Sequence, residues 1–358
     1  MHVLTMDGRR QDTVSPYARW QEAEGIPIYR GSYVEDLHTV AVASWPRLGQ
    51  KGAFVNLAEQ EHDDGWVVEI APSGQTAVQH HLFEALIYVL DGQGATTLWQ
   101  GNSDKKQTVE WQRGSVFAPP LNCYYQHFNL DGQMPARLFM VTHAPTMINL
   151  AGGMLNSVDF VFNNPYVFTD RYAVEDDFFT APGHRIAPRI EWKTNYIADV
   201  RTFKLDEKPE RGEGSSNMHI HLGNNSKLMS HISEWPVGTY LKGHRHGVGA
   251  HVVILDGEGY SLLWFEGEPR TKVPWRDGSV LSPKEWEYHQ HFNPGPSRVR
   301  YLAFRFGGFY AGRPSGGFPD QIEPAEEDPA IYDEFEQECA RNGVQPLYPR
   351  PKYPATSS

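Results

Sequence analysis

Short apolar runs alternate with polar, glycine-rich and proline-rich breaks over most of the chain. The runs are rich in Val, Ile, Tyr, Phe and Trp, as in YVLDGQGATTLW at 88–99. Residues of these types are typical of β-strands. The breaks DGQG at 91–94 and DGEG at 256–259 are typical of hairpin turns, in which glycine supplies a positive φ. The pattern predicts many short antiparallel strands that form sandwiches or barrels.

Two copies of one unit account for most of this pattern. YVLDGQGATTLW in the first copy matches VILDGEGYSLLW at 253–264, so that Gly92 corresponds to Gly257. WQRGSVFAPP and QHFN of the first copy recur as WRDGSVLSPK and QHFN in the second. Self-similarity at a fixed spacing indicates a duplicated structural unit. We therefore expect an all-β chain with two tandem, jelly-roll-like antiparallel β-barrels.

The remaining segments frame these two units. Residues 1–150 are predicted to form an N-terminal arm and the first barrel. Residues 151–225 are predicted to be an extended connector with little helix, and residues 226–310 the second barrel. In the C-terminal region 311–358, the stretch EEDPAIYDEFEQECAR at 326–341 predicts a short helix before a loose tail.

Composition and charge narrow the classes of function. The formal net charge is −12, and an acidic surface repels phosphate backbones, so neither nucleic acid nor an anionic membrane is an expected partner. No apolar run approaches the ~20 residues that span a bilayer, and the N-terminal residues lack the apolar core of a secretory signal. The two cysteines, Cys123 and Cys339, make a disulfide framework unexpected. The expected location is the cytoplasm.

Histidines in the second unit stand at fixed distances from its turn glycines. His244 and His246 form a His-x-His pair ahead of Gly257, and His289 follows Gly278. This spacing resembles the two motifs of the cupin superfamily, and the whole chain resembles a bicupin. The first cupin motif has the form Gly, His-x-His, Glu, Gly, and the second has the form Gly, Pro-x-Gly, His, Asn. The resemblance implies metal-binding β-barrels and a homo-oligomer, either a dimer or a tetramer.

In the second unit, the resemblance implies three metal ligands: His244, His246 and His289. Ala250 occupies the position of the motif glutamate, and His251 lies one residue out of register. Regular strand alternation points His251 away from the metal, whereas a bulge would turn it inward. His291 recurs as His127 in the first unit, which favours a structural role. His251 and His291 are therefore the less favoured ligands.

The first unit keeps much less of the motif. Gln79 and His81 take the His-x-His positions, Ala85 takes the glutamate position, and Tyr125 replaces the histidine of the second motif. Three further polar residues lie nearby but out of register: His80, Glu84 and His127. We interpret this barrel as one that serves packing or association and do not expect a second metal site.

The three ligand candidates suit an open metal site. Residues i and i+2 of a strand point to the same face, so His244 and His246 project together, and His289 from a distant strand can complete a triangle. Three imidazoles leave the opposite face of the ion open for substrate and dioxygen, as in non-haem Fe(II) oxygenases. The missing carboxylate makes the site one charge more positive, which favours an anionic substrate.

Among bicupins, three histidines without a carboxylate resemble the gentisate and salicylate dioxygenases. The resemblance predicts a mononuclear non-haem Fe(II) dioxygenase that acts with O2 on a small aromatic or hydroxy-carboxylate substrate in the second barrel. One alternative is a cupin-type decarboxylase, isomerase or lyase that uses Mn, Ni or Zn, and Cu also suits imidazole ligands. The other alternative is a non-catalytic cupin that binds a ligand.

Further residues are candidates for the wall of the substrate pocket. Arg305, in the alternating stretch RVRYLAFRFGG, would hold a substrate carboxylate in bidentate fashion if its strand face lines the barrel. His231 and Trp286 are candidates for the same wall, and His251 is a fourth. The alternatives are a surface position or an interface salt bridge for Arg305, a hydrogen-bonded structural role for His231 and core packing for Trp286.

Overall fold

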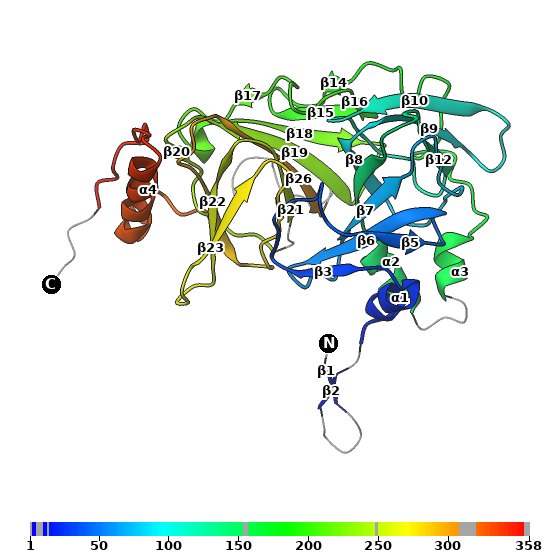
Figure 1. The fold of residues 1–358 in the computed structure, drawn as a ribbon, viewed down its shortest axis with the longest axis horizontal. Coiled ribbons are helices and arrows are strands. Elements are labelled where there is room, and N and C mark those ends of the chain that lie inside the picture. Colours follow the sequence, from blue (N-terminus) through cyan, green and yellow to red (C-terminus); the bar gives the residue numbers. More distant parts are fainter. Residues whose placement is uncertain are drawn as a thin grey trace.

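The computed structural model describes residues 2–4, 10–12, 14–152, 157–247, 250–307 and 320–353 (Figure 1). Strands dominate the described chain and form two barrels, with helices at the two far ends of the molecule (Figure 1). The all-β, two-barrel fold class predicted from the sequence is confirmed.

The first barrel consists of two sheets. The larger sheet runs in the order β16 (Tyr196–Ile197), β11 (Val116–Phe117), β8 (Ala85–Asp91), β13 (Ala136–Thr142), β7 (Asp64–Ile70), β6 (Gln50–Leu57) and β3 (Ile28–Gly31), with β5 (Ala43–Trp45) also paired to β6. The smaller sheet runs in the order β10 (Lys106–Gln112), β9 (Gln93–Trp99) and β12 (Tyr124–Asn129).

The second barrel repeats this arrangement. Its larger sheet runs in the order β14 (His184–Arg185), β15 (Glu191–Thr194), β18 (Ser216–Leu222), β19 (Leu228–Trp235), β26 (Val299–Phe306), β21 (Ala250–Asp256), β24 (Val280–Leu281) and β4 (Tyr33–Val34), with β17 (Asp206–Glu207) also paired to β18. Its smaller sheet runs in the order β20 (Thr239–Tyr240), β25 (Tyr288–Asn293), β22 (Glu258–Trp264) and β23 (Thr271–Arg276). A separate hairpin joins β1 (His2–Leu4) and β2 (Arg10–Asp12).

Segments expected to be arm and connector supply strands to both barrels. β4 of the N-terminal arm pairs with β24 of the second barrel, and β16 pairs with β11 of the first. β15, β17 and β18 also come from the predicted connector 151–225 and extend the second barrel. The residues of β18 alternate between polar and apolar, and its polar Asn217 and His219 line the interior of the barrel. Met218 and Ile220 of β18 pack into a hydrophobic core instead.

That core joins the two barrels. It contains Phe139 and Val67 of the first barrel together with Ile232 and Phe304 of the second, all of them buried. Because burial of apolar surface drives association of packed layers, this shared core holds the two barrels together as one body.

Short helices close both ends of the molecule (Figure 1). α1 (Pro16–Glu24) begins after Ser15, whose side chain accepts a hydrogen bond from the backbone N–H of Ala18, a typical N-cap. With α2 (Ala144–Ala151) and α3 (Ser157–Phe162), it packs on the apolar interior of the first barrel. α4 (Pro329–Arg341), the predicted C-terminal helix, packs on the second barrel through Phe335, which contacts Tyr240. None of the described helices is long and apolar enough to cross a membrane.

Candidate metal centre

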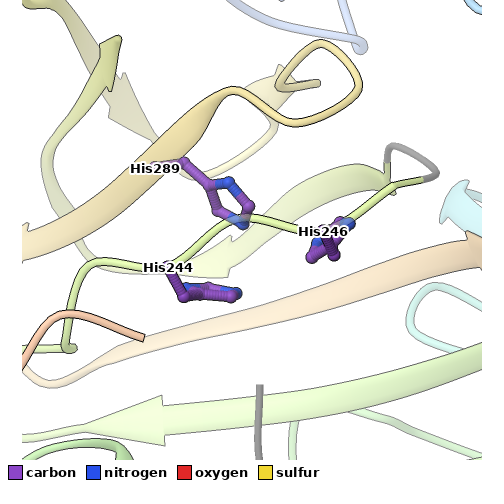
Figure 2. Close-up of side chains that lie close together, drawn as sticks. All are labelled: His244, His246 and His289. Carbon is purple, nitrogen blue, oxygen red and sulfur yellow. The ribbon is translucent and has the colours of Figure 1, made fainter. Parts of the chain in front are cut away.

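Three histidines converge inside the second barrel. His244 and His246 lie on the segment between β20 and β21, and His289 lies on β25 (Figure 2). One ligand nitrogen from each residue lies within 4.8 Å of those of the other two. Paired backbone hydrogen bonds of 3.1 and 2.9 Å join His244 to His289, so the backbone fixes the spacing of two of the rings.

The chemistry of these side chains fits a divalent transition metal. Nδ1 of His289 lies 3.1 Å from the carbonyl oxygen of Glu287, an arrangement that orients a ligand histidine and leaves Nε2 for a metal. Burial lowers the pKa of His289 to about 3 and holds the pKa of His244 well below its usual range. Both rings are therefore neutral at pH 7, the form that binds metal ions.

A strongly cationic cavity surrounds this cluster. Its volume is about 420 Å³ with its open mouth included, and Lys208, Arg211 and Arg305 contribute to its lining. Among the lining residues that the structure describes, none is a carboxylate. Burial lowers the pKa of each arginine from its high ordinary value and lowers that of Lys208 to about 8. All three side chains therefore remain mostly protonated at pH 7 and make the cavity a site for anions.

Two of these cations are positioned by well-defined elements. Arg211 ends the 3₁₀ helix η1 (Pro209–Arg211), and its Nη2 lies 3.5 Å from Nε2 of His244. Arg305 lies on β26, where it pairs in register with Ala250 of β21. Ala250 is the residue in the position of the cupin glutamate, so the cavity carries an arginine beside the place where the usual carboxylate ligand would stand.

Polar groups of β15, β18 and β19 form another wall of the cavity. His219 of β18 lines the cavity, and its Nδ1 lies 3.3 Å from Oε1 of Glu191 on β15. His231 of β19 also lines it, and its Nε2 lies 3.3 Å from the hydroxyl of Tyr301. His231 is among the residues predicted from the sequence for the pocket wall, whereas His219 and Glu191 are not. The available signal was the polar–apolar alternation in SNMHIHL at 216–222.

The other pocket candidates occupy different environments. Arg305 and His291 line the cavity with the three clustered histidines. His251 does not, because strand alternation turns it toward the first barrel, where its Nδ1 lies 3.3 Å from Oδ2 of Asp63. Trp286 is 48% exposed and lies outside the cavity lining, so its proposed place in the wall has to be corrected. Its backbone N–H donates a hydrogen bond to the carbonyl of His246.

The equivalent position of the first barrel is filled by its own side chains. Gln79 and Tyr125 form the same backbone bridge as His244 and His289. The His81 ring has partners at both nitrogens, since Nδ1 lies 2.7 Å from the carbonyl of Phe83 and Nε2 lies 2.7 Å from the Tyr125 hydroxyl. The scaffold of the metal cluster is thus retained, but no nitrogen of His81 is available to a metal.

Comparisons with known proteins support the fold. An oxalate decarboxylase of Bacillus subtilis with Mn(II) centres has a TM-score of 0.52 and 12% identity, covering 90% of this chain and 88% of that chain. The formate complex of oxalate decarboxylase from Lactobacillus farciminis has a TM-score of 0.53 and 12% identity, covering 89% and 96%.

No protein-family model matches the sequence, and no curated protein matches it. The structural likeness lies with oxalate decarboxylases and gives no support to the predicted resemblance to gentisate and salicylate dioxygenases. At this level of identity the likeness speaks for the fold alone. The chain therefore has the two-barrel fold of oxalate decarboxylases.

Proposed function

We propose that the second barrel is the active site of a metal-dependent decarboxylase that acts on a small dicarboxylate such as oxalate. The observation that carries this proposal is one cavity that combines a three-histidine cluster with Lys208, Arg211 and Arg305 and has no carboxylate in its described lining. A divalent ion on three neutral histidines keeps both of its charges. Together with three cations, it favours a substrate that carries more than one negative charge.

The lining of the cavity favours a small polar substrate over an aromatic one. Its apolar surface comes from Ala250, Val252, Ala303 and the ring of Tyr301, while the other lining residues are polar or charged, which leaves little apolar surface for a phenyl ring. Pockets for aromatic ligands are lined mainly by hydrophobic and aromatic side chains. Decarboxylation, an alternative reading of the sequence, is therefore preferred to oxidation of an aromatic acid.

The chain supplies binding and orientation for such a reaction. His244, His246 and His289 would hold the metal, for which Mn(II) is proposed because the structurally similar Bacillus subtilis enzyme has Mn(II) centres. The bound ion would act as a Lewis acid toward a carboxylate oxygen. Arg305 and Arg211 would hold the carboxylates through charge-assisted, bidentate hydrogen bonds. Held in this way, the substrate would have a fixed orientation in the cavity.

Metal content and product analysis test the proposal together. The protein is produced with added Mn(II), its metals are measured by mass spectrometry, and oxalate turnover is followed through formate and CO2. We expect about one Mn(II) per chain, loss of both metal and activity in His246→Ala, and retention of both in His81→Ala, its counterpart in the first barrel.

Two results would contradict the proposal. The first is a wild-type protein that carries Mn(II) but releases no CO2 from oxalate or other small dicarboxylates. The second is consumption of O2 in step with a phenolic or hydroxy-carboxylate substrate, which would restore the dioxygenase reading. The predicted dimer or tetramer stays a prediction, which sedimentation velocity of the same preparation would check.

A further inference from the structure

A buried carboxylate–histidine pair faces the cavity from the large sheet of the second barrel. Glu191 and His219 are directly paired in the parallel ladder of β15 and β18. Oε1 of Glu191 lies 3.3 Å from Nδ1 of His219, while Oε2 lies 2.6 Å from Nε2 of His221. The side chains of Glu191 and His219 are only 9% and 12% exposed. Such a pair orients an imidazole and fixes which of its nitrogens carries the proton.

The second nitrogen of His219 is left for a ligand. Within the described part of the chain, Nε2 of His219 has no hydrogen-bond partner, and the residue lines the cavity that holds the three-histidine cluster. A general acid–base needs one ring nitrogen held by an orienting group and the other directed to the substrate. Oε1 of Glu191 is near enough to Nδ1 of His219 to serve as the orienting group, and the place of His219 in the cavity wall suits the second requirement.

The first barrel shows that this wall does not need polar residues to fold. There, Ile28 of β3 pairs in parallel with Phe54 of β6, and Phe54 pairs with Trp66 of β7. In the second barrel, the same ladder positions of β15, β18 and β19 hold Glu191, His219 and His231. The apolar trio belongs to the hydrophobic core of its barrel.

Burial of an ionisable side chain has a desolvation cost that burial of an apolar side chain does not have. The second barrel nevertheless carries such groups at positions that its duplicate fills with hydrocarbon. A purely structural role would be served as well by apolar residues, and the difference between the copies therefore points to chemistry.

We propose that His219 is the general acid–base of this cavity and that Glu191 is the residue that positions it. This inference rests on the proposed decarboxylase function. In that reaction the carbon–carbon bond of the substrate breaks, CO2 leaves, and the bonding electron pair stays on the retained carbon. The proton on Nε2 of His219 is then transferred to that carbon, so that oxalate yields formate and CO2 and the histidine ends neutral. Solvent returns the proton before the next turnover, and no external oxidant or reductant is required.

The charges around His219 set the pH range in which this proton is present. Burial lowers the pKa of His219, the charge of Glu191 opposes that shift, and the nearby Lys208 and Arg305 add to it. His231 of β19 and His221 of β18 are the other titratable groups beside it. A bound dicarboxylate would offset the two cations, so binding of the substrate favours the protonated form of His219. Activity should therefore require an acidic group that is lost as the pH rises.

Three variants test the role of His219: His219→Gln, Glu191→Gln and, as the control, His184→Asn at an exposed histidine of β14. We expect His219→Gln to lower kcat for oxalate by about 10²–10⁴-fold with KM and Mn(II) content unchanged. Glu191→Gln should lower kcat less and shift the limb of the pH profile that is lost at high pH. His184→Asn should retain kcat within about threefold, since His184 is exposed and is not among the residues that line the cavity.

A spectroscopic measurement tests the pair independently of activity. Ring ¹⁵N spectra of histidine-labelled protein should show His219 with its proton on Nδ1 at neutral pH, and this tautomer should lose its dominance in Glu191→Gln. If Nε2 carries the proton in the wild type, the pair is not formed and the inference is wrong. If His219→Gln keeps wild-type kcat while oxalate is turned over, the inference alone fails. A wild-type protein without turnover overturns the proposed function, and the inference with it.

Discussion

A motif histidine can bind a metal only if one of its two ring nitrogens has no hydrogen-bond partner within the protein. His289 uses Nδ1 for the carbonyl of Glu287 and keeps Nε2 for a metal, whereas His81 has a partner at both nitrogens. Motif spacing identified both residues from sequence because spacing is a local property of the chain. It could not separate their roles, because Tyr125, the partner that occupies His81, comes from another strand.

His291 lies outside the three clustered histidines and recurs as His127 in the first barrel, which favours a structural role. Its Nδ1 lies 2.7 Å from the Ser261 hydroxyl, which also accepts a hydrogen bond from the Trp275 indole. The first barrel repeats the arrangement, with His127 bonded to Thr96. We expect His291→Ala to lower the free energy of unfolding by about 1–3 kcal/mol, measured by urea denaturation, and to leave the Mn(II) content unchanged. Loss of the metal in this variant would place His291 among the ligands instead.

Arg305 provides a prediction about substrate binding. A lysine keeps the charge but cannot form the planar, bidentate pair with a carboxylate. We expect Arg305→Lys to raise KM for oxalate about tenfold to a hundredfold, which corresponds to about 1.4–2.8 kcal/mol, with little change in Mn(II) content. Steady-state kinetics beside metal analysis would check this. An unchanged KM would show that the arginine does not contact the substrate.

At the scale of elements, short strands and turns interlock the two barrels. The N–H of Leu37 beside β4 donates to the carbonyl of Gly278 at 2.8 Å, and the N–H of Val200 beside β16 donates to Gly114 at 2.9 Å. The long strands and the C-terminal helix could both be predicted, because each has a regular apolar pattern along its whole length. β4 and β16 could not, since a two-residue strand has no periodicity and its partner lies in the other barrel.

The turn glycines make this interlock testable. Gly278 has φ +86°, and a Cβ there would lie 2.5 Å from Nδ1 of His38. Gly114 has φ +93°, and a Cβ there would lie 2.4 Å from Oδ1 of Asp199. We expect alanine at either position to lower the free energy of unfolding by about 2–4 kcal/mol. A positive φ costs a residue with a Cβ about 1–2 kcal/mol, and the steric clash adds to that cost.

Gly267 is the matched control for these variants. It has φ +81° and no atom within 4 Å of a Cβ, so Gly267→Ala should cost only the backbone term of about 1–2 kcal/mol. Thermal and urea denaturation of the three variants would measure the difference. Equal losses in all three would mean that the turns do not lock against the opposite barrel.

At the scale of the molecule, the two barrels divide their roles. The first barrel has an apolar wall of Phe54 and Trp66 where the second has His219 and His231. The barrels meet at the shared apolar core and at buried polar contacts, among them Asp63 with His251. The duplication was visible in the sequence. The motif histidines indicated from the sequence that the second copy holds the metal site. The cationic wall and the Glu191–His219 pair could not be predicted, because their residues come from strands that are distant in the sequence.

Glu84 joins the barrels through a buried carboxylate. It lies in the first barrel and accepts hydrogen bonds from the N–H groups of Ser226, Lys227 and Leu228 at 2.6–2.9 Å and from the Tyr172 hydroxyl at 2.7 Å. Burial by itself would raise the pKa of Glu84, but the nearby His143 ring and these donors outweigh it, so that the pKa lies below its usual range.

A carboxylate whose pKa is depressed by folding stabilises the protein above its unfolded pKa, about 4.3 for glutamate, and this contribution is lost as the pH falls through the folded pKa. Glu84→Gln should therefore lower the free energy of unfolding by about 3 kcal/mol at pH 7, and the deficit relative to wild type should shrink below about pH 4. Urea denaturation across this range measures the deficit. Glu266→Gln, at a glutamate with 79% exposure, should change stability by less than about 1 kcal/mol throughout. A Glu84→Gln deficit that stays constant from pH 7 to pH 3 would show that the interface does not depend on the ionised carboxylate.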